Sequence, residues 1–371
     1  MHGTHTDTSA NQTKCLLALK MIKGIGNATA LKLLQKFQSA GAVFQASYNE
    51  LRQAGLRSVL ITQIMDFDFC LVDEVLAWAK PASKNIISIN SPHYPPLLSQ
   101  INSPPIILFT IGNPEVLLTP QIAVVGTRNP TVQGLNSTSQ FSKAIVEHGL
   151  SVTSGLAIGI DGEAHRAALE VQGYTIAVTG TGLNRVYPAR HRELAHRIAD
   201  KGVLVSEKFP NEPFDQGSFQ QRNRIIAGLS LGTLVVEAAK KSGSLITANC
   251  AMEEGREVYA IPGSIHNPQV KGCHSLIKQG AKLVESIEDI IEDLPCVANG
   301  QVDKSNDLKV GRTPLNQQDT LFLQHIDFDI TPVDLIVTRS QLTVEAVTNK
   351  LLLLELDGWV INSAGGYIRQ Y

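Results

Sequence analysis

Cysteine and long apolar runs are the features that this sequence of 371 residues has least of. The 5 cysteines show no C-x-x-C spacing, which argues against a disulfide framework and against a zinc site, so no metal is expected. No apolar run extends over about 18 residues, the length that a membrane-spanning helix requires. The first residues also lack the cationic-then-apolar pattern of a secretory signal. These absences predict a cytoplasmic protein without a membrane segment.

Motifs of catalysis and of nucleotide cofactors are missing as well. The sequence has no G-x-G-x-x-G fingerprint after a strand and no Walker Lys-Ser/Thr pair. No Ser-His-Asp arrangement, no pair of carboxylates with an activating partner and no cluster of metal ligands stands out. We therefore expect a binding protein rather than an enzyme, and no cofactor.

The chain has almost no excess of either charge, with a net charge of −2, but its charges are unevenly distributed. Residues 1–90 hold 9 Lys and Arg against 6 acidic residues, and residues 122–285 hold 17 against 14. Residues 314–371 hold 3 against 7, a net charge of −4. A polyanionic partner is therefore expected to bind the first two thirds of the chain.

Apolar periodicity predicts a helical domain followed by an α/β core. Residues 1–90 carry apolar positions at helical spacing. Their Gly-x-Gly turn at residues 24–26 is either the hairpin of a helix-hairpin-helix module, whose amides meet a DNA phosphate, or an ordinary turn. In residues 91–296, a proline-rich connector over residues 91–121 precedes apolar strands that alternate with amphipathic helices. That alternation is typical of a Rossmann-like, doubly wound, mostly parallel sheet.

The end of the chain predicts a separate small domain. Residues 297–313 are polar and are expected to form a linker. Residues 314–371 predict three helices and a terminal hairpin, the shape of a winged-helix domain. Its third helix, over residues 343–358, offers Lys350 against three acidic residues. Because a DNA-reading helix needs cations, this domain is expected to add little DNA affinity and to contact protein or act in regulation.

Six loops that follow predicted strands are rich in glycine, hydroxyl and basic side chains. Because the carboxyl ends of parallel strands lie at one edge of a sheet, we expect these loops to lie side by side. At the first loop, Gly126 lets the backbone turn, Arg128 offers a forked donor, and the next helix presents its positive end. Together the loops predict a site for an anionic, phosphate-bearing ligand. They span residues 126–129, 154–165, 180–188, 215–224, 241–248 and 262–268.

Several of these residues also have a plainer interpretation. In this interpretation Arg128 is a surface arginine in a tight turn between strand and helix, and Asp161 only caps its helix. His165 is expected to be a packed or solvated histidine rather than a catalytic one. In the fourth loop, arginines beside Phe219 suit a single-stranded nucleic acid whose base stacks, but the alternative exposes Arg222 and buries the ring in the core.

Seven ordered motifs follow one another over residues 94–286: GTRNPTVQG, SGLAIGIDGEAHRAAL, GTGLNRVYPARH, VSEKFP, FQQRNRIIAGLS, VVEAAKKSGSLITA and AIPGSIHNPQVKGCHSLIKQGAKLV. Together they resemble the DprA (Smf) family of DNA-processing proteins. The resemblance implies a helical SAM-like domain, a Rossmann-like core and a winged-helix domain. It further implies a cytosolic bacterial protein that binds single-stranded DNA largely without sequence preference, protects incoming strands and helps to load the RecA recombinase in natural transformation and recombination. It also implies a homodimer formed through the core.

The same resemblance assigns roles to individual residues. It places Ile277 and Leu283 at the dimer interface. Where some relatives have a basic residue before the Gly-Ser-Phe of the fourth loop, this chain has Gln216, which is expected to remove about one phosphate contact. The residues that it implies for binding the DNA phosphates are Gly126, Thr127, Arg128, Ser154, Gly155, Arg222, Asn223, Arg224, Ser242, Gly243, Ser244 and Thr247.

Two other functions compete with DNA binding. The glycine-rich core also looks like that of nucleotide-processing phosphoribohydrolases of the lysine-decarboxylase-like type, which carry a PGGxGTxxE signature. The nearest stretch here, SLGTLVVEA, lacks the double glycine, so Glu237 is expected to be a residue at the end of the sheet rather than a catalytic acid. The third possibility is a scaffold whose main partner is a protein bound through the C-terminal domain.

Overall fold

The computed structural model describes residues 4–213, 217–294, 317–328, 330–363 and 365–369. Its contacts divide the chain into two compact units, Met1–Gln301 and Val302–Tyr371. The predicted linker over residues 297–313 and Gln216 lie outside the described residues. The linker and the boundary expected near residue 90 remain predictions.

The first unit begins with a group of short helices packed against the sheet that follows. Two of them begin at serine caps, and Ser47 forms a capping box with Glu50. The fully buried Leu17 and Leu19 of the first helix share one apolar cluster with Phe109 of the sheet. The helices are α1 (Thr4–Met21), α2 (Asn27–Phe37), α3 (Ala40–Gln45), α4 (Tyr48–Gln53), α5 (Ser58–Met65) and α6 (Cys70–Trp78).

A nine-stranded sheet forms the core, in the order β1-β2-β6-β5-β4-β3-β7-β8-β9. The seven strands from β6 to β9 in this order are parallel, whereas β1 and β2 run antiparallel at one edge. This arrangement, completed by helices on both faces, confirms the predicted mostly parallel, doubly wound α/β fold. The strands are β1 (Lys84–Ser88), β2 (Ile107–Gly112), β3 (Gln121–Val125), β4 (Ser151–Ser154), β5 (Thr175–Val178), β6 (Val203–Ser206), β7 (Gly232–Val235), β8 (Glu257–Ala260) and β9 (Lys282–Leu283).

Strand β1 is a feature that apolar periodicity did not predict. Its residues were assigned to the helical domain, but they pair with β2 from Lys84 opposite Ile111 to Ser88 opposite Ile107. The strand is short and only its end is buried, so it has little apolar pattern of its own. Its place in the sheet depends on pairing with β2.

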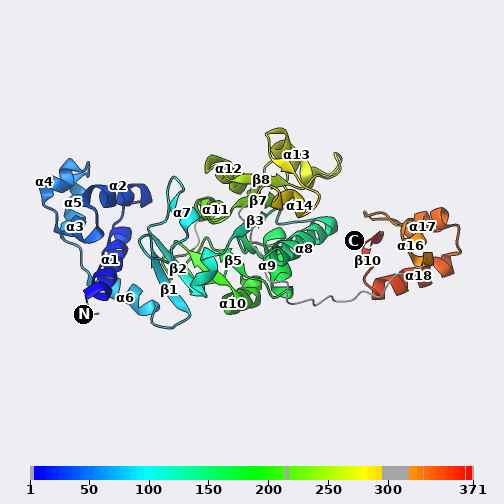
Figure 1. Ribbon diagram of the computed structural model, residues 1–371, viewed down its shortest axis with the longest axis horizontal. Coiled ribbons are helices and arrows are strands. Elements are labelled where there is room, and N and C mark those ends of the chain that lie inside the picture. The colour runs from blue at the N-terminus through cyan, green and yellow to red at the C-terminus, as the bar shows by residue number, and fades with distance from the viewer. Residues whose placement is uncertain (1–3, 214–216, 295–316, 329, 364, 370–371) are drawn as a thin grey trace. The chain divides into compact units, whose positions relative to one another are not determined.

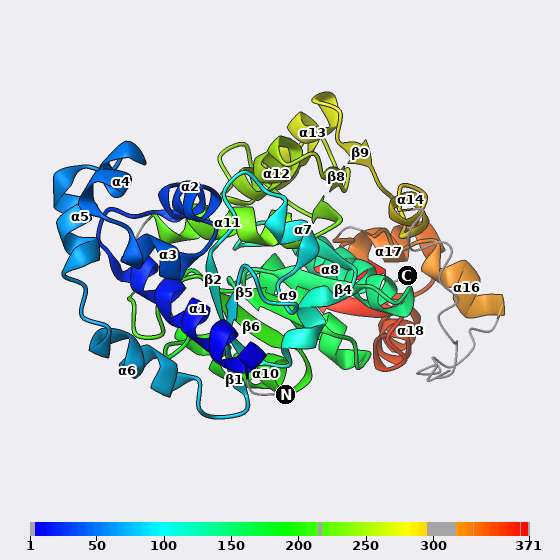
Figure 2. The same cartoon turned by 60° about the vertical axis from the view of Figure 1, so that its left-hand side comes forward.

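Helices cover both faces of the sheet because successive strand residues point to opposite sides (Figure 1, Figure 2). Ile122 and Val124 of β3 pack with α8 and α9, whereas Ala123 and Val125 share a cluster with α11 and α12. The first face carries α8 (Val132–Glu147), α9 (Ile160–Glu170), α10 (Arg192–Lys201) and α14 (Glu288–Ile291). The second face carries α7 (Pro96–Ser99), α11 (Ser218–Leu229), α12 (Ser244–Glu253) and α13 (Lys271–Lys278).

The second unit contains the helices and the hairpin that its sequence predicts. Phe322, Ile336, Val347 and Val360 form its small apolar core. Among the described residues, its elements are α16 (Gln317–Leu323), α17 (Val333–Ser340), α18 (Val344–Leu356) and the antiparallel pair β10 (Val360–Ser363) and β11 (Gly366–Arg369).

The described helices of both units include no segment that is long and apolar enough to cross a membrane.

Candidate functional site

A pocket of about 450 Å³, here called the edge pocket, lies where β3 and β7 end. The strand order reverses between these two strands, because β4 follows β3 on one side and β7 joins it on the other. Ligands of open α/β sheets bind at such a position. Eight of the twelve predicted phosphate-binding residues line the edge pocket: Gly126, Arg128, Arg222, Asn223, Ser242, Gly243, Ser244 and Thr247.

Arg128 stands exposed at the edge pocket. Its guanidinium carbon lies 5.1 Å from the centroid of the Phe219 ring, and it makes no hydrogen bond or ion pair to the described residues. The backbone before it is fixed, because the Thr127 amide donates to the Glu237 carbonyl at 2.7 Å. At Gly126 a Cβ would lie 2.6 Å from Ile160 Cγ1, so only glycine lets α9 approach this closely.

The N-terminus of α12 forms another wall of the edge pocket. Gly243 is the N-cap and has no side chain to cap the helix, and the Ser244 amide donates to the Ser242 hydroxyl at 3.4 Å. The Leu245 and Ile246 amides donate to the carbonyls of Ser242 and Gly243. The hydroxyls of Ser242 and Ser244 lie 2.7 Å apart, and Thr247 is buried one turn further on. Hydroxyls at the positive end of a helix favour a bound anion.

Arg222 lies beneath the edge pocket rather than at its surface. It is only 5% exposed, and its Nη1 donates to the Val178 carbonyl at 2.9 Å. Burial lowers its pKa to about 10, and the negative charge of nearby Asp161 opposes this shift. A Cβ at residue 155 would lie 1.7 Å from Nη1, so Gly155 makes room for the guanidinium. Arg222 therefore contributes positive charge from below the edge pocket. The alternative interpretation, in which Arg222 is exposed, is wrong.

Two titratable residues of the second loop, Asp161 and His165, have structural roles. Asp161 is not the N-cap of α9, which is Gly159 at φ 83°. Its carboxylate lies within the first turn and accepts the Ala157 amide at 3.4 Å, and burial raises its pKa against the effect of Arg222. His165 is fully buried, with Nδ1 2.7 Å from the Thr175 hydroxyl. Burial lowers the pKa of His165 to about 3, so it is a neutral, packed histidine.

Four predicted residues, Thr127, Ser154, Gly155 and Arg224, do not line the edge pocket, and the side chains of Ser154 and Arg224 are engaged elsewhere. Ser154 is fully buried, and its hydroxyl donates to the Val124 carbonyl inside the sheet at 2.6 Å. Arg224 points away from Arg222 because residues two apart on a helix project in different directions. Its guanidinium pairs with Glu207 and lines a different hollow.

Beside the edge pocket, Phe219, a candidate stacking ring from the sequence, is joined by Tyr187, which was not among the predicted site residues. The rings of Tyr187 and Phe219 lie 5.8 Å apart, and Tyr187 is 48% exposed. We call this pair the aromatic shelf. With Arg128, Gly155 and other residues it lines a smaller hollow of about 60 Å³. Phe219 is half-buried rather than a core residue, and the signal for Tyr187 was its position in the third strand-end loop.

The expectation that the helix after Gly126 presents its positive end to the ligand is wrong. Glu237 already occupies the N-terminus of α8, where its carboxylate accepts the Thr131 amide at 2.9 Å and the Thr131 hydroxyl at 2.5 Å. Gly134 leaves the space for it, since a Cβ there would lie 2.4 Å from the Glu237 carboxyl carbon. Glu237 is thus a buried structural carboxylate just beyond the end of β7.

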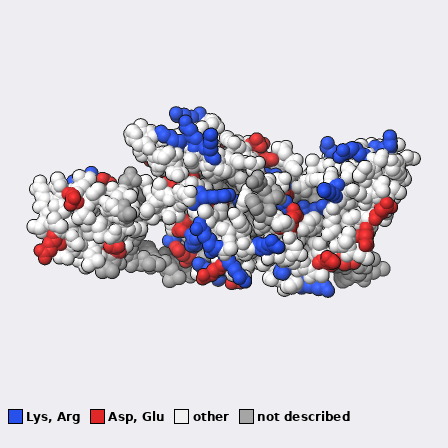
Figure 3. All heavy atoms as spheres, turned by 180° about the vertical axis from the view of Figure 1, so that it is seen from behind, with Lys and Arg blue, Asp and Glu red and all other residues white. Residues whose placement is uncertain are grey.

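The other predicted positions lie on the far side of β8. Ile277 is half-buried on α13, and Leu283 on the edge strand β9 is 43% exposed. Figure 3 shows Lys and Arg side chains gathered over the lobe that carries α12 and α13. In the part of the chain that the structure describes, no group of three or more His, Cys, Asp or Glu side chains could hold a metal ion.

Two family models match this chain. The model described as DNA recombination-mediator protein A matches residues 85–295, and the DprA winged helix domain matches residues 312–366. Protein Smf of Escherichia coli (strain K12) is 40% identical over 325 residues, which cover 86% of each chain. DNA processing protein DprA of Bacillus subtilis (strain 168) is 44% identical over 222 residues, 60% of this chain and 75% of the relative.

Solved structures agree with these sequence matches. The X-ray structure of DNA processing protein A from Streptococcus pneumoniae has a TM-score of 0.68 and 38% identity, and covers 76% of this chain and 97% of that one. DNA processing protein A from Helicobacter pylori, described for its single-stranded DNA binding mode, has a TM-score of 0.52 and 27% identity. That match covers 57% of this chain and 96% of the other.

Proposed function

This chain belongs to the DNA recombination-mediator protein A family, and from that premise we propose that it binds single-stranded DNA at the edge pocket and the aromatic shelf. One observation carries the proposal. The exposed guanidinium of Arg128, which no described residue pairs, lines the edge pocket with the N-terminus of α12 and lies over the Phe219 ring. A phosphate donor and a stacking surface therefore lie next to each other.

The two parts of the site fit the two parts of a nucleotide. The hydroxyls of Ser242 and Ser244 at the positive end of α12, together with Arg128, suit a phosphate. The aromatic shelf suits a base, whose flat face stacks on a ring whatever its sequence. Stacking requires an unpaired base, so single strands are preferred over duplex DNA.

The test is a titration of the full chain with labelled oligo-dT and with duplex DNA across a salt series. We expect a salt-sensitive preference for oligo-dT. Equal binding of the two DNAs, or binding that salt does not weaken, contradicts the proposal.

Replacing Arg128 by Ala should weaken binding to all single-stranded sequences alike, by about tenfold, because one charge-assisted contact is lost. The slope of log affinity against log salt should fall by about 0.7, the value for one phosphate contact on a single strand. Arg197→Ala is the matched control, because Arg197 is an exposed arginine on α10 that does not line the edge pocket. An unchanged affinity in Arg128→Ala would show that Arg128 does not contact the DNA and would contradict the proposed site.

The finer proposal concerns what happens to the bound strand. We propose that the protein protects incoming single strands in the cytoplasm and helps to load the RecA recombinase in natural transformation and recombination, as a homodimer. Family membership supports these roles. Nuclease digestion of bound oligo-dT and the rate of RecA filament assembly test them, and a chain that binds DNA but changes neither would restrict the function to binding.

We also propose that binding proceeds without catalysis. The one acid that the phosphoribohydrolase alternative requires, Glu237, is engaged by Thr131 at the start of α8. Release of free base from nucleoside monophosphates by the purified chain would instead favour that alternative.

A further inference from the structure

A second hollow, of about 470 Å³, lies between the start of α2 and the core. We call it the junction site. Its lining includes Lys20, Gly26 and Asn27 from the helical part and Glu207, Lys208 and Arg224 from the core. It shares no lining residue with the edge pocket.

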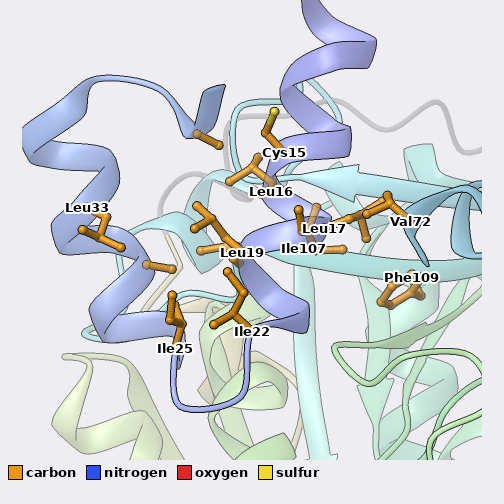
Figure 4. Packing of buried hydrophobic residues seen from close by; sticks show 14 of the residues in the cluster. Cys15, Leu16, Leu17, Leu19, Ile22, Ile25, Leu33, Val72, Ile107 and Phe109 are labelled. Carbon is orange, nitrogen blue, oxygen red and sulfur yellow. The ribbon is translucent and has the colours of Figure 1, made fainter. Parts of the chain in front are cut away.

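The Gly-x-Gly turn is what brings the start of α2 to this hollow. Gly24 adopts a φ of 101°, and the buried side chains of Ile22 and Ile25 lie side by side where the turn joins the two helices (Figure 4). Gly26 is the N-cap of the 11-residue helix α2 and provides no side-chain cap. Amides of the first turn of α2 therefore have no side-chain acceptor and lie at the junction site. Ile25 and Gly26 of the turn therefore line the junction site, whereas Lys23 and Gly24 are exposed.

Among the described charged residues that line the junction site, Lys20 is the cation without an ion-pair partner. Glu207 pairs with Arg224 and accepts a hydrogen bond from the side-chain amide of Asn27 at 3.3 Å. Glu212 pairs with Lys208 at 2.6 Å. Lys20 makes no hydrogen bond or ion pair to the described residues, and its Nζ lies 5.6 Å from the centroid of the Phe209 ring.

Lys20 is also half-buried and lines the hollow. Burial lowers its pKa, and the negative charges of Glu207 and Glu212 oppose this shift. Lys208 and Arg224 lower the pKa further. A bound anion would compensate the half-buried ammonium and accept hydrogen bonds from the amides of α2.

We propose that the junction site binds a phosphate group on Lys20 and the first amides of α2. The group belongs either to the same single strand that the edge pocket binds or to a free phosphate compound. The first source rests on the proposed function, whereas the second does not.

The test is the protection of Lys20 from an amine-acylating reagent in the full chain, measured by peptide mass spectrometry. The probes are oligo-dT and inorganic phosphate, and the exposed Lys32 of α2, which does not line the hollow, is the internal control. Protection of Lys20 but not Lys32 by both probes, or by oligo-dT alone, supports a site for the strand. Protection by inorganic phosphate alone supports a site for a small phosphate compound. Protection by neither probe overturns the junction site.

A variant separates this inference from the proposed function. Lys20→Met should weaken oligo-dT binding by about fivefold and lower the salt slope by about 0.7, and Lys32→Met should change neither. In Arg128→Ala, inorganic phosphate should still protect Lys20, because the two sites share no residue. If oligo-dT does not bind the unaltered chain, the proposed function fails, and the phosphate experiment still decides whether the junction site exists. Unchanged oligo-dT binding in Lys20→Met excludes the strand as its source.

Discussion

Two arginines, Arg128 and Arg222, lie near the ring of Phe219, and they differ in solvent exposure and therefore in role. The Arg128 guanidinium carbon lies 5.1 Å from the ring centroid and the Arg222 carbon 5.7 Å, but Arg128 is exposed and Arg222 is buried. An exposed arginine can exchange water for phosphate, whereas a buried one bonded to a carbonyl holds structure and charge in place.

At the residue scale, stacking and charge can be separated by experiment. Phe219→Leu should weaken oligo-dT binding by about 1–3 kcal/mol, the contribution of one base–aromatic stack, and leave the salt slope unchanged. Arg128→Ala should change the slope. Salt titrations of the two variants measure this difference, and a slope that falls in Phe219→Leu would mean that the ring only positions Arg128.

The fit between Gly155 and Arg222 predicts a large effect on stability. Gly155→Ala places a methyl group 1.7 Å from the present position of Nη1, so the buried guanidinium must move and lose its bond to Val178. We expect a loss of about 2–4 kcal/mol in the free energy of unfolding, measured with urea. Gly243→Ala is the control, because nothing lies within 4 Å of a Cβ there. A Gly155→Ala chain as stable as the control would contradict the tight fit.

At the scale of elements, the N-termini of α8 and α12 near the sheet edge differ in the side chains that lie at them. The start of α8 holds the Glu237 carboxylate, whereas the start of α12 carries the uncharged hydroxyls of Ser242 and Ser244. Only the second can accept a phosphate, since the first is already compensated by a negative charge. The helix after the first glycine loop is therefore structural, and the helix after the fifth loop forms the site.

The edge strand β9 predicts how two copies associate. Leu283 is exposed on this strand, and β9 pairs with β8 on one side only. Leu283→Glu should convert the proposed dimer into a monomer, because a charge would be buried in an apolar contact. Light scattering after size exclusion measures the mass. Leu118→Glu, a similarly exposed leucine near β3, should leave the mass unchanged. A wild-type monomer would contradict the proposal.

At the scale of the whole molecule, the two units differ in the charge they offer to DNA. In residues 314–371 the three basic side chains already have partners: Arg339 pairs with Asp327 at 2.8 Å, Lys350 pairs with Asp319 at 2.6 Å, and Arg369 donates to the Leu323 carbonyl at 3.3 Å. The helix α18 instead exposes Leu352 and Leu353. Such a surface favours a protein partner over a nucleic acid.

The corresponding prediction concerns the full chain. The double variant Arg339→Gln and Lys350→Gln should bind oligo-dT with the affinity and the salt slope of the unaltered protein, because neither cation is free to contact phosphate. The titration described for Arg128 measures both quantities. A slope reduced by about 0.7 or more would show that this unit contacts DNA directly.

The sequence by itself determined the parts that depend on local pattern. Apolar runs that alternate with amphipathic helices predict a parallel sheet, and glycine and hydroxyl residues after six of the predicted strands indicate the sheet edge where we propose that a ligand binds. Eight of twelve predicted residues line the edge pocket for this reason. The strand-end loops could be recognised because each loop directly follows its own strand along the chain.

Only the tertiary structure decided which side chains share a surface. Arg222 and Arg224 are two residues apart, yet one lies under the edge pocket and the other at the junction site. Glu237 reaches Thr131 across 106 positions of sequence, and the hairpin before α2 turns toward the core. These contacts join residues that are distant along the chain, so they depend on how the elements pack and leave no periodic pattern in the sequence.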